Sequence, residues 1–277
     1  MIKIIDIDAL FDKYIEKYVY ENIGKIKPDE IEDKIAELYK DFGDKPLVEL
    51  GGRTPNTFYR EYASKELLDC LKEHVEKEVA VSDFLLEAII ASEDGEKTLV
   101  GALDYEECEE MVAYIMNMLS DMGAKVPVEK YLGFALWDYP DSIGELATES
   151  LCNAAEEAKE AVLAAYKDAA EDKKPRLTEI LSNVKGDDRV FDILVAEFAK
   201  NTDNIPLYAS YLAKYGDERA LPFLMTAIEG EKISYADFEE LRFAIETLGG
   251  KYDKERDFSQ DKTYKKIKGG KNNIKRA

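Results

Sequence analysis

The sequence predicts an all-α protein whose second half is built from repeated pairs of helices. Apolar residues recur along the chain at the helical spacing i, i+3, i+4 and i+7, and glycines close several of these stripes. A helix start with a glycine, an aspartate and an arginine occurs twice, at Gly186 and at Gly216. No alternating strand pattern of useful length is present, apart from a short one at Ile2–Ile5.

The N-terminal part of the chain, residues 1–125, is expected to be helical but irregular. Its first two stripes contain Leu10, Phe11, Tyr14, Ile15 and Tyr18, then Ile31, Ile35, Leu38 and Phe42. A third stripe contains Leu67, Cys70, Leu71, His74 and Val75. Thr54 can cap a helix that begins at Pro55, and Ser82 with Asp83 begins another.

The strongest single helix is predicted over 104–123. Asp104 and Glu107 have the spacing of a capping box, and Gly123 follows the last turn. The apolar stripe between them contains Cys108, Met111, Val112, Ile115, Met118, Leu119 and Met122. Two shorter helices are predicted next, around Val128–Trp137 and Ser142–Cys152.

The two glycine-led helix starts belong to one repeating unit. Gly186, Asp187 and Arg189 match Gly216, Asp217 and Arg219, and the stripes around them also correspond. The matched stripes are Phe191, Leu194, Val195 and Phe198 with Leu221, Leu224, Met225 and Ile228, and before them Leu177, Ile180, Leu181 and Val184 with Tyr208, Tyr211, Leu212 and Tyr215. The unit is therefore a helix pair of about 30–34 residues, which must stack on further copies to bury both stripes.

Each residue of this signature has a local physical reason. The glycine lets the chain leave a helix in a left-handed conformation, and the aspartate accepts backbone N–H groups at the next helix start. Pro222 is expected at the end of a first turn, where it removes one helical hydrogen bond and bends the entry.

The signature resembles the Gly-Asp-x-Arg-Ala-Leu-Pro-x-Leu start of HEAT-like repeats of the phycobilisome-lyase type. GDERALPFL at 216–224 fits that pattern closely, and GDDRVFDIL at 186–194 fits it without the proline. The resemblance covers about 175–250, extends back to about 126, and implies an α-solenoid. It implies little about activity, since this family consists mostly of binding scaffolds, with a minority acting on chromophores or DNA bases. We expect right-handed stacking of helix pairs over 126–250, followed by a tail over 251–277.

The charge balance excludes some partners. The whole chain carries −21 and residues 262–277 carry +7, which leaves −28 for residues 1–261. A body this acidic repels phosphate groups, so we expect neither a nucleic-acid nor a membrane partner. We expect a cytoplasmic protein for three reasons. The three cysteines are widely spaced, the N-terminus has no signal peptide pattern, and no apolar run reaches roughly 18–20 residues.

Residues that carry chemistry are mostly missing, so we expect no catalytic residue, metal site or cofactor. His74 is the single histidine and lies one turn after Cys70, but the apolar stripe around them favours a packed thiol and a satisfied histidine over a Cys–His dyad. The loop that contains Arg53 favours a capped loop over a phosphate site.

A few residues are candidates for binding a protein partner. Trp137 and Tyr139 join two predicted helices. Phe243 lies off the apolar stripe of its helix, so it either anchors a partner or packs against Tyr252 or Phe258 of the tail. Packing against the tail is the favoured interpretation, because a terminal repeat needs its open end covered. The charged neighbours of Phe243 are Glu239, Arg242 and Glu246. Equivalent helices of the repeats are also predicted to share two outward-facing positions. The first position is occupied by Glu179, Ser210 and Phe243, and the second by Thr178, Ala209 and Arg242.

Three kinds of function stay open, and the oligomeric state is not fixed. The favoured one is a non-catalytic scaffold or adaptor that binds an unknown protein partner along its last two helix pairs. The second is an enzyme, either lyase-like or a base-excision glycosylase, although the latter needs a basic groove. The third is a self-associating structural or regulatory module, in which the basic tail of one chain meets the acidic body of another.

Overall fold

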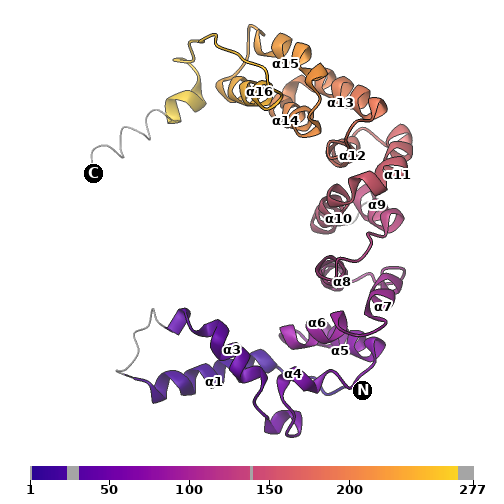
Figure 1. Cartoon of the computed structure of the whole chain (residues 1–277), viewed down its shortest axis with the longest axis vertical. Coiled ribbons are helices and arrows are strands. Elements are labelled where there is room, and N and C mark those ends of the chain that lie inside the picture. Colours follow the sequence, from indigo (N-terminus) through magenta and orange to yellow (C-terminus); the bar gives the residue numbers. More distant parts are fainter. Residues whose placement is uncertain (1, 24–30, 138–139, 268–277) are drawn as a thin grey trace. The chain divides into compact units, whose positions relative to one another are not determined.

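The computed structural model describes residues 2–23, 31–137 and 140–267 of the chain (Figure 1). These residues form helices and contain no strand, which confirms the all-α prediction. They divide into two compact units, Met1–Pro127 and Val128–Ala277. None of the described helices is long and apolar enough to cross a lipid bilayer.

The described helices of the first unit lie on either side of a short 3-10 turn. Their bounds are α1 Ile7–Glu21, α3 Ile35–Gly43, η1 Val48–Leu50, α4 Pro55–Phe58, α5 Ser64–Glu76, α6 Asp83–Ile90, α7 Gly95–Ala102 and α8 Glu109–Asp121. The strand predicted at Ile2–Ile5 is wrong: these residues belong to no strand or helix. Ile2 and Ile5 are buried, because apolar side chains enter a core with or without a sheet.

An aromatic cluster joins three helices of the first unit. The Tyr39 ring on α3 lies 4.8 Å from the Phe11 ring on α1 and 4.9 Å from the Phe84 ring on α6, measured between centroids. Phe42 packs against Phe11 at 5.3 Å. Such contacts add about 0.5–1.5 kcal/mol per pair beyond the area they bury.

Helix α8 begins five residues later than the capping-box spacing predicted. Glu106 lies before it, and its carboxylate accepts the backbone N–H groups of Glu107 and Cys108 at 3.2 and 3.0 Å. The same carboxylate accepts a hydrogen bond from Lys72 Nζ at 3.0 Å. Because Glu106 is buried and meets these donors, α8 starts beyond it, and Cys108 becomes an exposed N-cap instead of a core residue.

The second unit consists of helix pairs in chain order. Its bounds are α9 Val128–Leu136, α10 Asp141–Asn153, α11 Ala155–Asp168, α12 Lys174–Leu181, α13 Asp188–Lys200, η2 Thr202–Asn204, α14 Ile205–Tyr215, η3 Glu218–Ala220, α15 Leu221–Ile228 and α16 Tyr235–Thr247. Each odd-numbered helix packs against the next even-numbered one, and α10 also contacts α12 as α14 contacts α16. In Figure 1, α13 and α15 lie on one side of this unit, and α14 and α16 on the other.

The predicted signature geometry is confirmed at both helix starts. Gly186 and Gly216 have φ values of 66° and 84°, in the left-handed region. Asp187 and Asp217 each accept the amide two residues ahead, at 3.1 and 2.9 Å. The role predicted for Pro222 is wrong: it lies in the first turn of α15, after the 3-10 turn η3, where an amide has no helical partner to lose.

The arginine of the signature reaches back to the preceding helix pair. Arg189 pairs with Glu160 on α11 at 2.7 Å, and Arg219 pairs with Asp188 on α13 at 2.8 Å. These pairs are exposed and contribute little stability on their own. Each arginine also pairs with the aspartate of its own helix start, so the same arrangement recurs in two successive helix pairs.

Candidate functional site

The even-numbered helices of the second unit present one row of equivalent positions to the surface. Glu179 on α12 is half-buried, whereas Ser210 on α14 and Phe243 on α16 are exposed. The Phe243 side chain is 65% exposed, unusually high for a phenylalanine. These three positions therefore face outward as predicted, and the residue type changes from one helix to the next.

The second predicted row is wrong for two of its three members. Thr178 and Ala209 are fully buried, and only Arg242 reaches the surface. The Thr178 hydroxyl donates to the Lys174 carbonyl at 2.8 Å, which satisfies it inside the helix bundle. Small residues are suited to this row because neighbouring helices pack closely there.

A charged frame surrounds Phe243 on α16. Arg242 Nη2 lies 3.0 Å from Glu239 Oε2, and its Nε lies 3.9 Å from Glu246 Oε1. These i, i+3 and i, i+4 pairs hold the guanidinium along the helix surface. Leu241, Ala244 and Ile245 on the opposite side of α16 are buried, so the helix cannot rotate to hide its aromatic residue.

The tail covers the last helix pair but leaves Phe243 uncovered. The rings of Tyr252 and Phe258 lie 5.8 and 5.0 Å from the Phe238 ring, while Tyr264 packs on Tyr235 at 5.0 Å. The expectation that Phe243 receives the tail aromatics is therefore wrong. Phe238 lies five residues earlier on α16. Five residues make about 1.4 turns of a helix, so the Phe238 side chain points to a different side of α16 from Phe243.

A groove lies on the surface shared by α10, α12 and α14. It encloses about 430 Å³ and is lined by Glu145, Thr148, Glu149, Cys152, Asn153, Arg176, Glu179, Asn183 and Lys214. Burial raises the pKa of the Cys152 thiol to about 11, with Glu179 acting in the same direction. The thiol is therefore protonated at neutral pH and is a poor nucleophile.

Arg176 is committed to a structural role at the edge of this groove. Its Nη1 donates to the Ala135 carbonyl at the end of α9, and its Nη2 pairs with Asp141 at the start of α10, both at 3.2 Å. Gly144 gives the guanidinium its room, since a Cβ there would lie 2.5 Å from Nη1. The groove consequently has few cations to offset its glutamates.

Trp137 and Tyr139 were predicted at the junction of two helices. Trp137 follows α9 directly, and its side chain is 68% exposed. Tyr139 lies outside the described residues. The structure places Trp137 on the second unit but provides no contact that brings it together with Phe243 into a single site.

The cysteine–histidine pair on α5 lies inside the first unit. His74 is fully buried, and its Nδ1 lies 2.8 Å from the Ala80 carbonyl, while its Nε2 has no partner among the described residues. Burial raises the pKa of the Cys70 thiol to about 11. A nucleophilic cysteine needs a lowered pKa, so this geometry fits a packed thiol.

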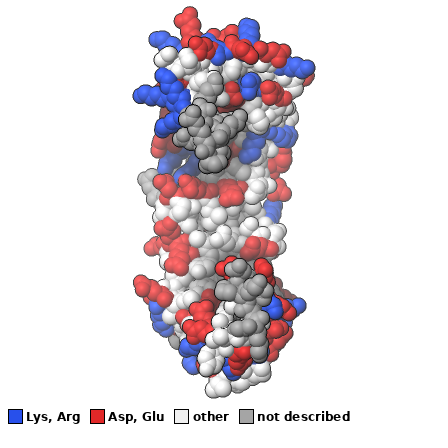
Figure 2. Space-filling view, turned by 90° about the vertical axis from the view of Figure 1, so that its left-hand side faces the viewer, with Lys and Arg blue, Asp and Glu red and all other residues white. Residues whose placement is uncertain are grey.

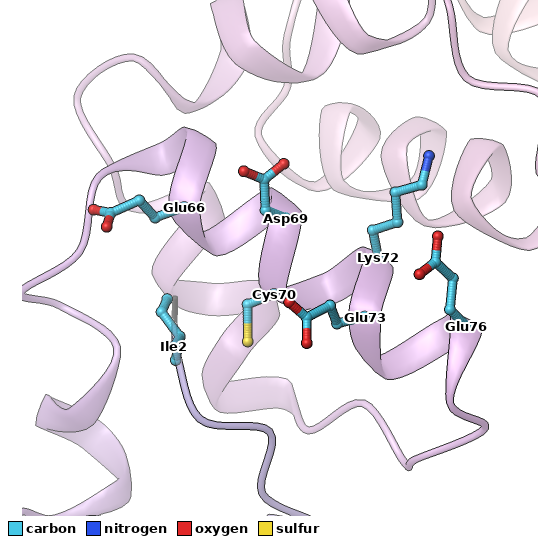
Figure 3. Close-up of a pocket in the computed structure, with 7 residues that line it drawn as sticks. All are labelled: Ile2, Glu66, Asp69, Cys70, Lys72, Glu73 and Glu76. Carbon is cyan, nitrogen blue, oxygen red and sulfur yellow. The ribbon is translucent and has the colours of Figure 1, made fainter.

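A second hollow lies beside Cys70 and encloses about 390 Å³. Its walls are formed by Ile2, Glu66, Asp69, Cys70, Lys72, Glu73 and Glu76. Figure 3 shows these carboxylates splayed along α5 instead of pointing at a common centre. Among the residues that the structure describes, no three His, Cys, Asp or Glu side chains are placed to hold a metal ion.

Sequence reasoning missed most of the groove on α10, α12 and α14. Only Glu179 was singled out, whereas Glu145, Glu149 and Lys214 were not. The i, i+4 spacing of Glu145 and Glu149, off the apolar stripe of α10, was the available signal. Searches against protein families, curated proteins and solved structures found no match to this chain.

Proposed function

We propose that the second unit is a right-handed α-solenoid of HEAT-like helix pairs that acts as a non-catalytic protein-binding scaffold. Three observations support this architecture. The signature repeats, successive helices pack in pairs, and neighbouring pairs touch through α10 with α12 and through α14 with α16. Solenoids keep their buried stripes constant and vary the outward positions, which is how they present a specific surface. The row Glu179, Ser210 and Phe243 follows that rule.

The observation that carries the proposal is the exposure of Phe243. Its side chain is 65% exposed although the tail places aromatic rings a short distance away, on Phe238. Aromatic residues and arginines contribute most per residue at protein interfaces, and Arg242 lies beside it. We therefore assign the partner's anchoring point to α16, with Arg242, Glu239 and Glu246 at its rim.

Photo-cross-linking tests this assignment. A photoreactive phenylalanine analogue at position 243 should form a discrete adduct with one or a few proteins of the source cell. The same analogue at Phe223, a 42% exposed phenylalanine on α15, is the matched control. Equal adducts at the two positions, or none at position 243, would remove the anchoring role from α16.

A further inference from the structure

Three buried side chains of the first unit have a polar atom without a hydrogen-bond partner among the described residues. These atoms are Tyr59 Oη, His74 Nε2 and Ser82 Oγ, and each of the three side chains is at most 1% exposed. Charged side chains are spread over the viewed face in Figure 2, where water solvates them, whereas these three atoms have no access to the surface. The buried serine, threonine and glutamate side chains elsewhere in the described part of the chain do meet partners: Ser64, Glu106, Thr148, Thr178, Ser182 and Glu197. Buried polar groups without partners are rare in folded proteins, so these three need a physical explanation.

The three groups come from adjoining segments of one core. Tyr59 follows α4, His74 lies on α5, and Ser82 precedes α6, which packs against α5. Burial raises the pKa of the Tyr59 phenol and the Ser82 hydroxyl acts in the opposite direction, so the two oxygens are neighbours. The Asp8 carboxyl interacts electrostatically with the Tyr59 phenol and with the His74 ring, which places the ring in the same region.

The loop between α5 and α6 is attached to His74 at two points. The His74 carbonyl accepts the Val79 amide at 2.9 Å, and Nδ1 donates to the Ala80 carbonyl at 2.8 Å. Ser82 comes two residues after Ala80 and is the N-cap of α6, yet its hydroxyl makes no capping hydrogen bond. A serine at this position normally accepts an amide of the first helical turn. The Ser82 hydroxyl is therefore free to bond to another group in the core.

The His74 ring defines what these three groups can bind. A carbonyl oxygen can only accept, so Nδ1 carries the proton and Nε2 of the neutral ring presents a lone pair. A ligand must therefore donate a hydrogen bond to Nε2, and it can donate to or accept from the two hydroxyls. A charged ligand would lose its hydration among three neutral groups, which is costly. A water molecule has the donors and acceptors that this set requires, and buried waters typically make about three such bonds.

We propose that Tyr59, His74 and Ser82 together bind one internal water molecule, which donates to His74 Nε2 and links it to the two hydroxyls. This water connects the end of α4 and the start of α6 to α5, so it holds the loop between α5 and α6 in the core. The site belongs to the first unit and does not depend on the scaffold proposal.

Removing one hydroxyl gives opposite results with and without this water. If the phenol had no partner, Tyr59→Phe would remove a buried unsatisfied group and would leave the first unit equally stable or more stable. With the water in place, the substitution takes a hydrogen bond from it. We therefore expect the amides of α5 in the full chain to exchange with deuterium roughly tenfold faster. Tyr105→Phe, on a side chain that is 69% exposed, is the control and should leave the exchange unchanged. Unchanged or slower exchange in Tyr59→Phe would overturn the proposal.

Oxygen-17 relaxation dispersion counts the water molecules that a protein holds far longer than its surface waters. Tyr59→Phe/Ser82→Ala leaves Nε2 as the only partner at the site, whereas a buried water is held by several. We therefore expect the full-chain double variant to hold one long-lived water fewer than the wild type, and Tyr105→Phe to hold the same number. Equal numbers in the wild type and the double variant would contradict the proposal.

Nitrogen-15 NMR of the wild-type chain tests the site without any substitution. His74 is the single histidine, so its two ring nitrogens give unambiguous signals. We expect a protonated Nδ1 and an unprotonated Nε2 that accepts a hydrogen bond, and the Nε2 resonance should move toward that of a free lone pair in Tyr59→Phe/Ser82→Ala. A proton on Nε2 of the neutral ring in the wild type would remove the acceptor on which the water depends, and the proposal would then be wrong.

Discussion

The phenolic hydroxyl of Tyr215 donates to the backbone carbonyl of Asp187 and accepts its amide, at 2.8 Å in each case. Tyr215 closes α14 and Asp187 caps α13, so one side chain joins the end of one helix to the start of its partner. Lys185 Nζ adds a hydrogen bond to the Tyr215 carbonyl at 2.9 Å. The helix start at Gly186 and Asp187 is therefore stabilised by the partner helix α14 as well as by its own N-cap.

Removing this hydroxyl should destabilise the second unit. Tyr215→Phe leaves two partly buried backbone groups without partners, so we expect a loss of about 1–3 kcal/mol in the free energy of unfolding. Urea denaturation followed by circular dichroism measures it. Tyr20→Phe, on a side chain that is 77% exposed, is the control and should leave the unfolding free energy unchanged. Equal midpoints for the two variants would contradict the joining role.

A methyl group at Gly144 should force the Arg176 guanidinium to move. In Gly144→Ala the new methyl group meets Nη1 at 2.5 Å and displaces the guanidinium from Ala135 and Asp141. We expect destabilisation of about 1 kcal/mol, from the loss of the Arg176 hydrogen bonds. Gly133→Ala on α9 has open space around its Cβ and should instead stabilise by about 0.5–1 kcal/mol. Thermal melts of both variants test this difference in sign.

The cap at Glu106 should make stability depend on pH. Burial acts to raise the pKa of Glu106, but hydrogen bonds from the Cys108 amide and from Lys72 outweigh it and lower the pKa below its ordinary value of 4.5. Stability from a carboxylate with a depressed pKa is present above the unfolded pKa and is lost as pH falls through the folded pKa. Glu106→Gln should therefore lower stability at pH 7 and flatten its decline between about pH 5 and pH 3.

Denaturation curves across that pH range measure the effect. Glu107→Gln is the control, since Glu107 is exposed and only its amide takes part in the cap. A decline of the same slope in the wild type and in Glu106→Gln would show that this carboxylate does not set the acid sensitivity.

The three cysteines should differ in reactivity. Cys108 is exposed at the start of α8, whereas burial raises the pKa of both Cys70 and Cys152 to about 11. Iodoacetamide at neutral pH should thus label Cys108 first, since the thiolate is the reactive form. Peptide mass spectrometry over time reports each site, and faster labelling of Cys70 would reopen the dyad interpretation of Cys70 and His74.

Truncation at the proposed anchor should weaken partner binding without unfolding the chain. Phe243→Ala and Arg242→Ala should each reduce the affinity for a protein captured at position 243 by roughly 1–3 kcal/mol, as hot spots do. Arg242→Ala should cost under about 0.5 kcal/mol of stability, because its pairs are at the surface. Cys70→Ser is the binding control. Isothermal titration of the purified partner measures all three, and loss only in Cys70→Ser would place the site in the first unit.

The sequence by itself determined the helical class and the signature of the pairs. The apolar spacing determined the helices, since a stripe at that period cannot be buried by a strand. The roles of Gly186 and Asp187 also followed from local chemistry, because a left-handed turn and an N-cap are decided within a few residues. The fully buried stripe positions Leu177, Leu212 and Leu224 were found for the same reason.

Only the tertiary structure decided which partner each of the remaining residues meets. Glu106 displaced the predicted capping box because Lys72, distant in sequence, lies beside it. The tail aromatics Tyr252 and Phe258 pack against Phe238 and not against Phe243, because the chain after α16 runs along the Phe238 side of that helix. Thr178 is buried by a neighbouring helix that its own periodicity cannot reveal. Local rules concern residues within one turn, whereas these outcomes depend on contacts between segments that only the folded chain brings together.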